Sequence, residues 1–497
     1  MNAALRKEVR LLLPAWIVAL VASTLPAWVP GMGVQSMELI SCVIFAAGAL
    51  LLSLSSFGLE MSFGTYSSLL AQPRPRQDTW RLKIGVLAVA LTLLVVMAAF
   101  SSWLRAIVLL ADNTRNWYEQ RNDVDYFRLF WPVHVRSLLL LAVMAFAGGL
   151  WTTILFRQMV TAFWFSVLVP LVLYGAAMPS LQEISQDEDF AFQMAFVGVA
   201  ACAYAVAGYV LARWLFVRAQ DKQPSEATEV ARWSFLPGFA TPRRPVPVVA
   251  LMVKELRLQD GTLVIAAVLV MLHLAALAAL RYFPALASKY PFLNGVWMVW
   301  LVAPLLIGCA CVAEERRDRT LEGALCLPVA KLGHFAIKLM VVFGLGILLG
   351  AVAPCLLEQL RPRLSFSHAL GPDNSLSALI LTATVITAIG CYASSLSGTL
   401  LQAFGAALGL FIVSPMVFAI FNSRPELAHQ SWALSQPFLI AAFFFLTYAN
   451  FKQLRITRRQ SLCNGIVWLA LVLGPPVLLF FANGIPFFIY YWKKVLL

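Results

Sequence analysis

Two stretches of the sequence repeat each other at a distance of 255 residues. Residues 60–83 read EMSFGTYSSLLAQPRPRQDTWRLK, and residues 315–338 read ERRDRTLEGALCLPVAKLGHFAIK. One offset aligns seven chemically matched pairs: Glu60 with Glu315, Thr65 with Thr320, Leu70 with Leu325, Pro73 with Pro328, Arg76 with Lys331, Trp80 with Phe335 and Lys83 with Lys338. An earlier echo, at an offset of 247, matches Lys7-Glu8-Val9-Arg10 with Lys254-Glu255-Leu256-Arg257. The chain therefore contains an internal repeat.

The composition around these stretches is that of a membrane protein. Of the 497 residues, 61% are hydrophobic and 12% are charged, whereas about a quarter of the residues in a soluble domain are charged. This balance excludes a cytosolic enzyme, a disordered chain and a secreted disulfide scaffold. The eight cysteines are widely spaced and mostly lie in apolar runs, so they are interpreted as small buried hydrophobic residues rather than zinc ligands.

Apolar runs of the length that a bilayer requires, about 20 residues, divide the chain into two sets of six. The sequence predicts spans near 11–29, 38–58, 84–104, 136–156, 159–178, 193–216, 262–280, 293–313, 339–357, 375–396, 399–420 and 434–451, with one more near 464–482. The expected fold is all-α, with two pseudo-symmetric six-helix bundles and one extra C-terminal membrane segment. The domains are then residues 1–218, a cytoplasmic linker at 219–248, residues 249–460, and a C-terminal segment with an interfacial tail at 461–497.

The distribution of basic residues predicts a cytoplasmic N-terminus. Most of the 37 lysines and arginines fall in the segments that this orientation places inside, and the longer outer loops carry the acidic residues. The formal net charge of +13 is therefore interpreted as membrane topology, and nucleic acid is not an expected partner.

Each repeated stretch follows the second span of its set and has a readable physical pattern. Thr65 and Thr320 suit a helix start, and nearby carboxylates favour the positive end of that helix. Pro73 and Pro328 end the helix. The basic residue and the aromatic residue that follow each proline are expected at headgroup level, and Lys83 and Lys338 are expected to anchor the cytoplasmic end of the third span. One copy alone would indicate an interfacial connector, but two copies in register favour a part that receives force from a cytosolic partner.

This pattern, with Lys-Glu-x-Arg before each first span, resembles the permease subunits of ABC-2 type transporters. The resemblance covers roughly residues 1–220 and 249–460, and it implies two permease halves fused in one chain. The first copy lacks the Glu-Arg-Arg run of residues 315–317, and the span near 464–482 has no counterpart in the first half.

The resemblance also implies three groups of site residues. The residues expected to couple to the ATPase are Glu60, Gly64, Thr65, Pro73, Arg76, Lys83, Glu314, Glu315, Arg316, Thr320, Glu322, Pro328, Lys331 and Lys338. Arg157 and Ser397 mark secondary inner turns. The N-terminal interfacial helices carry Lys7, Glu8, Arg10, Lys254, Glu255 and Arg257. No catalytic residue or metal site is expected, and the residues that contact cargo are not identified.

The sequence contains no phosphate-binding loop of the form Gly-x4-Gly-Lys-Ser/Thr. ATP and Mg²⁺ are therefore expected on a separate cytosolic ABC ATPase subunit, in two copies, and this chain is expected to bind no cofactor and to perform no catalysis of its own. The resemblance implies export across a bacterial inner membrane. A mostly apolar path slightly favours an amphipathic or hydrophobic cargo.

Two other functions are weighed against this one. A twelve-span secondary transporter also divides into six and six, but the chain has few intramembrane charges. A lipid-modifying membrane enzyme is disfavoured because the five histidines are scattered, and His273, the one within a span, is interpreted as a hydrogen-bonded packing residue. The spacings Gly346-x3-Gly350 and Gly405-x3-Gly409 predict close helix packing.

Overall fold

The computed structural model consists of helices, and the residues that it describes contain no β-strand. The described residues are 3–28, 34–73, 75–110, 117–177, 187–219, 247–282, 291–317, 320, 330–360, 376–421, 425–453 and 463–467. Residues 220–246 of the predicted linker, the predicted span near 464–482 apart from its first residues, Glu322 and Pro328 lie outside these ranges, and the predicted linker overlaps the start of the helix at Pro247–Leu258.

The helices form two sets along the chain, here called the first set (residues 3–219) and the second set (residues 247–453). The first set contains α1 (Ala3–Thr24), η1 (Leu25–Trp28), α2 (Val34–Ser62), α3 (Tyr66–Leu70), α4 (Arg76–Leu110), α5 (Trp117–Phe156), α6 (Met159–Ala177) and α7 (Asp187–Val217). The second set contains α8 (Pro247–Leu258), α9 (Asp260–Tyr282), η3 (Pro291–Leu301), α11 (Val302–Arg317), α13 (Lys331–Ile347), η4 (Leu348–Val352), α14 (Ala353–Glu358), α16 (Leu376–Leu396), α17 (Leu400–Phe421) and α18 (Pro425–Phe451).

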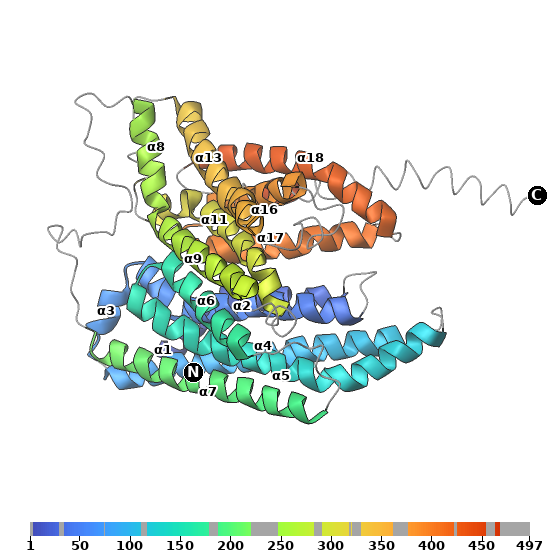
Figure 1. Ribbon diagram of the computed structural model, residues 1–497. Coiled ribbons are helices and arrows are strands. Elements are labelled where there is room, and N and C mark those ends of the chain that lie inside the picture. The colour runs from blue at the N-terminus through green and yellow to red at the C-terminus, as the bar shows by residue number, and fades with distance from the viewer. Residues whose placement is uncertain are drawn as a thin grey trace, which may run out of the picture.

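Helices are found at the twelve predicted spans from 11–29 to 434–451. Among the described residues, nine helices are long and apolar enough to cross a bilayer, and shorter apolar helices lie within α6, α17 and α18. The described part of the chain is thus helical, and its long apolar helices indicate a multi-pass membrane protein. Figure 1 shows the long helices running broadly side by side, with α3 and α8 both toward the left-hand side of the molecule.

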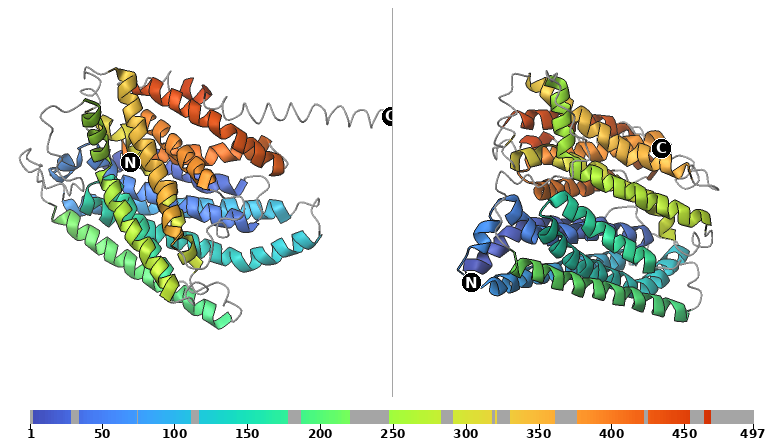
Figure 2. Two further views of the ribbon diagram at one scale, coloured as in Figure 1. Left: turned by 45° about the horizontal axis from the view of Figure 1, so that its top comes forward. Right: turned by 60° about the vertical axis from the view of Figure 1, so that its left-hand side comes forward.

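The two sets differ where each begins. In the first set, α1 runs without a break from Ala3 into the first apolar run, so its basic start belongs to the same helix as the span. In the second set, the corresponding stretch breaks after Leu258 into α8 and α9. The helix α8 meets α9 at an angle, as the different views show (Figures 1 and 2).

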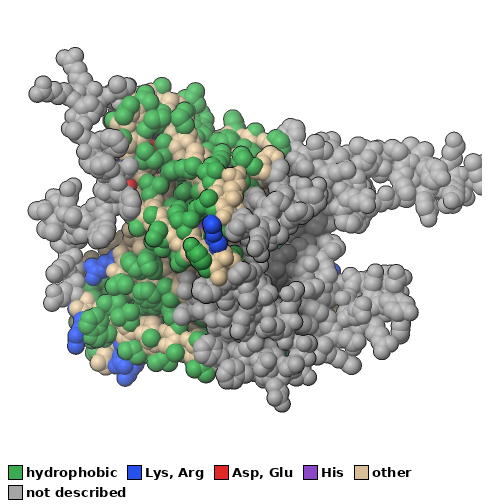
Figure 3. All heavy atoms as spheres, in the orientation of Figure 1, with side chains coloured by type: hydrophobic (Ala, Val, Ile, Leu, Met, Phe, Trp, Pro, Cys, Tyr) green, Lys and Arg blue, Asp and Glu red, His purple; other side chains and the backbone are tan. Residues whose placement is uncertain are grey.

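The outer surface of the helices is apolar. Along α4, the side chains of Val89, Leu93, Val96, Phe100 and Trp103 are exposed, and their spacing of three or four residues places them on one face of the helix. Figure 3 shows hydrophobic side chains over most of the described part of one face, with basic side chains gathered mainly along the left-hand edge. Such a surface is stable against lipid and would be costly in water.

Close helix contacts in each set depend on glycine. A Cβ added at Gly149 of α5 would lie 2.6 Å from the Cβ of Ser53 in α2, and a Cβ added at Gly390 of α16 would lie 3.0 Å from the amide nitrogen of Cys309 in α11. The two helix pairs therefore approach each other backbone to backbone.

The predicted glycine spacings are only partly correct as packing motifs. A Cβ at Gly346 would meet the hydroxyl of Thr387 at 2.4 Å, and one at Gly350 would lie 2.3 Å from the Pro304 ring. A Cβ at Gly405 would lie 3.2 Å from Leu51, whereas one at Gly409 would have nothing within 4 Å. Gly409 is therefore not a close-packing residue within the described part of the chain.

The two sets meet through α6 and α17. The helix α17 packs on α1 and α2, and α6 packs on α9. The rings of Phe163 in α6 and Phe404 in α17 meet edge to face with centroids 4.7 Å apart. These contacts join the sets into one core.

Candidate coupling site: two buried ion-pair clusters

Three helix ends of the first set meet at a cluster of four charged side chains, here called cluster A (Lys7, Glu8, Glu60 and Lys83). The Lys83 Nζ donates to Glu8 Oε2 at 2.8 Å and lies 3.0 Å from Glu60 Oε2. It also donates to the carbonyl of Ser56 at 3.3 Å. Lys7 Nζ donates to Glu60 Oε1 at 3.1 Å. Cluster A thus joins the start of α1, the end of α2 and the start of α4.

The second set contains the same arrangement, here called cluster B (Lys254, Glu255, Glu315 and Lys338). Lys338 Nζ donates to Glu255 Oε2 at 2.6 Å and lies 3.0 Å from Glu315 Oε2. It also donates to the carbonyl of Cys311 at 3.0 Å. Lys254 Nζ donates to Glu315 Oε1 at 2.5 Å. Cluster B joins α8, the end of α11 and the start of α13.

The two clusters correspond contact by contact. Every residue of cluster B stands at the position that the repeat assigns to its counterpart in cluster A. The backbone acceptors of the central lysines, Ser56 and Cys311, are also separated by 255 residues. Thr65 and Thr320 each donate to the carbonyl five residues earlier, at 3.3 and 3.4 Å. The sequence repeat therefore coincides with repeated side-chain geometry.

Each cluster is electrically balanced, and its central lysine and both carboxylates are shielded from solvent. The side chains of Lys83 and Lys338 have no exposed surface, whereas Lys7 and Lys254 are 51% and 34% exposed. With two lysines and two carboxylates, each cluster has no net charge when all four groups are ionised. Removing one member of a buried ion pair costs far more than replacing the whole pair by apolar groups, so each cluster holds its helix ends as a unit.

Cluster B has an additional ionisable neighbour, His334, beside Glu255. His334 Nε2 lies 4.0 Å from Glu255 Oε1 and Lys254 Nζ lies 3.9 Å from the same oxygen, while Thr79 occupies the position in the first set that matches His334. Burial raises the pKa of Glu255, Lys338 opposes that rise, and the carboxylate of Glu315 adds to it. Glu255 is thus the carboxyl group of cluster B that most depends on its lysine.

These clusters correct two expectations from the sequence. Lys83 and Lys338 are not exposed anchors at the membrane surface, because they are buried in the protein and paired with carboxylates there. Thr65 precedes α3 but makes no side-chain cap there, and Glu60 binds Lys7 and Lys83 rather than the helix start. The helix after Thr65 is present, and it ends at Leu70, before Pro73.

The predicted aromatic positions pack inside the protein beside the clusters. Trp80 stacks on Phe57 with ring centroids 5.7 Å apart and contacts Phe216 of α7 at 5.5 Å. Phe335 contacts Phe451 of α18 at 5.4 Å. Trp80 and Phe335 are 2% and 4% exposed, so they link each repeated segment to the last helix of its set instead of lying among lipid headgroups.

The secondary inner turns lie close to these segments. Arg157, with a positive φ of 53°, places its guanidinium 6.0 Å from the ring centroid of Tyr66 in α3. The carbonyl of Ser397 accepts a hydrogen bond from Arg316 at 3.5 Å. Both predicted turns therefore contact residues of the repeated stretches.

The other predicted residues are more peripheral. Gly64 has a φ of 68°, which suits glycine at the turn between α2 and α3. Glu314 lies 3.7 Å from Arg317. The exposed members of the predicted set, outside the clusters, are Arg10, Gly64, Thr65, Pro73, Arg157, Arg257, Thr320 and Lys331.

The second set also contains a buried hydrogen-bond network of three side chains that the sequence analysis did not predict. His273 of α9 lies with Nε2 3.2 Å from Glu358 Oε1 of α14, and Trp300 Nε1 donates to His273 Nδ1 at 3.2 Å. Because Nδ1 accepts, the imidazole is neutral and Nε2 carries the proton that it donates to Glu358. The packing role predicted for His273 is consistent with this network, but its carboxylate partner, 85 residues away, left no local signal.

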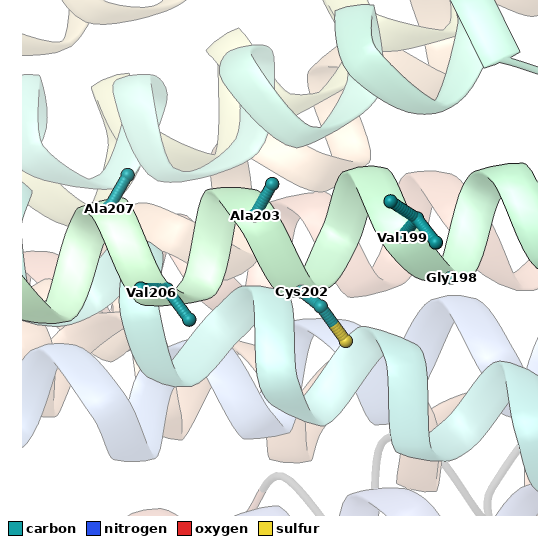
Figure 4. A pocket seen from close by; sticks show the side chains of 6 residues that line it. All are labelled: Gly198, Val199, Cys202, Ala203, Val206 and Ala207. Carbon is teal, nitrogen blue, oxygen red and sulfur yellow. The ribbon is translucent and has the colours of Figure 1, made fainter.

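The described surface also contains a shallow apolar groove. Its lining residues all belong to one face of α7 (Figure 4): Gly198, Val199, Cys202, Ala203, Val206 and Ala207. The described residues contain no group of His, Cys, Asp or Glu that could hold a metal ion. The two clusters are therefore the most developed polar sites within the described part of the molecule.

Comparisons with protein-family models, curated proteins and solved structures returned no match to this chain.

Proposed function

We propose that this chain is the membrane-spanning permease subunit of an ATP-driven ABC transporter of the ABC-2 type. Residues 1–218 and 249–460 would be its two permease halves, and two copies of a separate cytosolic ABC ATPase would power it. The observation that carries the proposal is the pair of matching clusters. In each set, the cluster joins the two ends of the repeated stretch to each other and to the helix that carries the Lys-Glu-x-Arg motif.

The clusters suit a part that transmits force. A push on α3 or on the corresponding segment after Thr320 reaches α2 or α11 directly through the chain. Cluster A then carries the displacement to α1 and α4, and cluster B carries it to α8 and α13. An ion-paired joint between three helix ends moves them together, whereas an interfacial connector needs no such joint.

Further contacts support a division into two related bundles. The close approach at Gly149 involves Ser53 and Leu54, and the one at Gly390 involves Gly308 and Cys309. These α2 and α11 residues are again 255 positions apart, while the two glycines are 241 apart. Phe163 and Phe404, which touch each other, are also 241 apart. Contact between equivalent residues is typical of an axis that relates two halves.

Reconstitution tests this function. The chain is purified with the ABC ATPase subunit proposed as its partner, placed in proteoliposomes, and assayed for ATP hydrolysis and for ATP-dependent movement of a fluorescent lipid analogue. We expect both activities from the wild type. Glu315→Gln should lower transport more than hydrolysis because cluster B loses an anion, while Arg281→Gln, an exposed cation at the far end of α9, should match the wild type.

A twelve-span secondary transporter is the second candidate. The pair formed by His273 and Glu358, buried within the membrane-spanning helices, favours it, because such residues often relay protons. The same proteoliposomes distinguish the two functions. Transport driven by a proton gradient without ATPase or ATP would refute the ABC proposal.

A further inference from the structure

One arginine in each set binds the carbonyl groups at the C-terminal end of the last helix of that set. Arg76 Nη1 donates to the carbonyls of Val217 and Ala219 at 2.9 and 2.7 Å, where α7 ends. Arg316 Nη2 donates to the carbonyls of Asn450 and Gln453 at 3.2 and 3.3 Å, where α18 ends. The last carbonyls of a helix have no partner within it, and a cation there is favourable.

The two arginines are not equivalent in the repeat. The offset of 255 places Lys331 opposite Arg76 and Met61 opposite Arg316, and Lys331 is exposed. Within the repeated stretches, Arg76 begins α4, on the C-terminal side of α3, whereas Arg316 lies in the last turn of α11, on the N-terminal side of Thr320. The same connection to the last helix is thus made from different parts of the repeated stretch.

Arg316 has a wider set of partners than Arg76. Its Nη1 donates to the carbonyls of Ser395 and Ser397 at 2.6 and 3.5 Å, at the turn between α16 and α17. Asn450 Nδ2 donates to Ser395 Oγ at 3.0 Å, and Asn464 Nδ2 donates to Asn450 Oδ1 at 2.7 Å. Residues 463–467, which follow the second set, are therefore joined to the same contacts.

We propose that Arg76 and Arg316 are positioning residues that transmit movement of the repeated segments to α7 and α18, with the stronger link in the second set. This inference rests on the proposed permease function and adds an asymmetry to it. Arg76 holds one helix end by two carbonyls. Arg316 holds an inner turn and a helix end by four, and it is adjacent to Glu315 of cluster B.

The chain offers matched controls for both arginines. Arg218 lies over the ring of Trp214 at 4.9 Å, and Lys452 lies over the ring of Tyr448 at 3.9 Å. Arg218→Gln and Lys452→Gln remove a positive charge from the same two helix ends and leave the contacts of Arg76 and Arg316 in place.

Hydrogen exchange of the full chain in nanodiscs tests the contacts without an ATPase. Arg76→Gln should speed exchange in peptides covering 213–219 about two- to fivefold, because the carbonyls of Val217 and Ala219 lose the hydrogen bonds that hold this helix end, which the control variants keep. Arg316→Gln should do the same at 448–453 and 393–398. Each variant should leave the other set unchanged, and both control variants should match the wild type. Unchanged exchange in the arginine variants would overturn the inference.

Transport per ATP hydrolysed, measured in the reconstituted complex, tests the transmission. We expect at least a twofold fall for Arg76→Gln and a larger fall for Arg316→Gln, with the control variants at the wild-type ratio. An unchanged ratio of transport to ATP hydrolysis, whether or not both rates fall, would overturn this inference and leave the proposed function standing. A wild-type complex without ATP-dependent transport would instead refute the proposed function.

Discussion

Replacing the central lysine of cluster A should strongly destabilise the protein. In Lys83→Met, the carboxylate of Glu8 loses a cation at 2.8 Å and remains in a nearly solvent-free site, while Glu60 keeps Lys7 at 3.1 Å. One buried charge is thus left without compensation. Removing one partner of a buried pair typically costs about 3–5 kcal/mol, and we expect a loss of this size in the free energy of unfolding.

The matched change in cluster B should have a pH-dependent cost. In Lys338→Met, Glu255 keeps Lys254 only at 3.9 Å, and burial together with Glu315 already raises its pKa above the ordinary value of 4.5. Without the lysine, the folded state binds a proton more tightly than the unfolded state does. Stability therefore decreases as pH rises through the raised pKa of Glu255, so the deficit of Lys338→Met should shrink as pH is lowered.

Double-mutant cycles separate an uncompensated charge from lost packing. The free energy of unfolding is measured in mixed micelles for Lys83→Met, for Glu8→Gln and for the double variant. Because the double variant buries no unpaired carboxylate at position 8, it should recover about 2 kcal/mol or more relative to Lys83→Met. Additive losses, or a single variant within about 0.5 kcal/mol of the wild type, would refute the assignment of cluster A as a buried ion-paired joint.

Further substitutions test the glycine packing, the buried tyrosine Tyr66 and the hydrogen bond between His273 and Glu358. Gly350→Ala should destabilise by about 1–3 kcal/mol, since its Cβ would lie 2.3 Å from a proline ring, whereas Gly409→Ala, with open space, should be neutral or slightly stabilising in the same unfolding assay. Burial raises the pKa of Tyr66 to about 12, so the wild type should lose stability above pH 10 and Tyr66→Phe should show a smaller loss in thermal unfolding against pH. His273→Phe should destabilise by about 2–4 kcal/mol because it removes the hydrogen bond that His273 donates to the buried Glu358, and the addition of Glu358→Leu should recover part of that loss; no recovery would contradict the hydrogen bond.

The positions of the helices could be predicted from the sequence because apolar length and periodicity are local properties. The break between α8 and α9 could not, since no proline or glycine interrupts residues 254–259 to mark it. The burial of Lys83 could not be predicted either. In the sequence, a buried lysine next to an apolar run looks the same as a lysine that extends to the lipid headgroups. Its partner Glu8 lies 75 residues away in sequence, beyond the reach of any periodic pattern.

One signal in the sequence did contain the clusters. Two lysines and two glutamates in each copy stand at repeated positions, and their charges balance within a copy. Charge balance among repeated positions would have indicated mutual pairing, whereas each residue taken alone indicates an interfacial anchor. His273 and Glu358 belong to no repeat and have no such signal, so their contact required the three-dimensional arrangement.

The two sets share their joint and differ in what surrounds it, which bears on what the joint does. Apolar residues of similar volume would pack these helix ends at no loss of stability, because a buried ion pair rarely exceeds such packing in strength. The same four-residue cluster nevertheless occurs in each copy, as cluster A and as cluster B, while the connections to the last helices pass through Arg76 and Arg316, which do not correspond in the repeat. A charged joint fixes the relative register of three helix ends by directional contacts and still allows its partners to exchange when the ends shift, which an interlocked apolar contact does not. Under the proposed permease function, the repeated element would be the moving joint of each half, and the differing arginines would set how far that movement reaches.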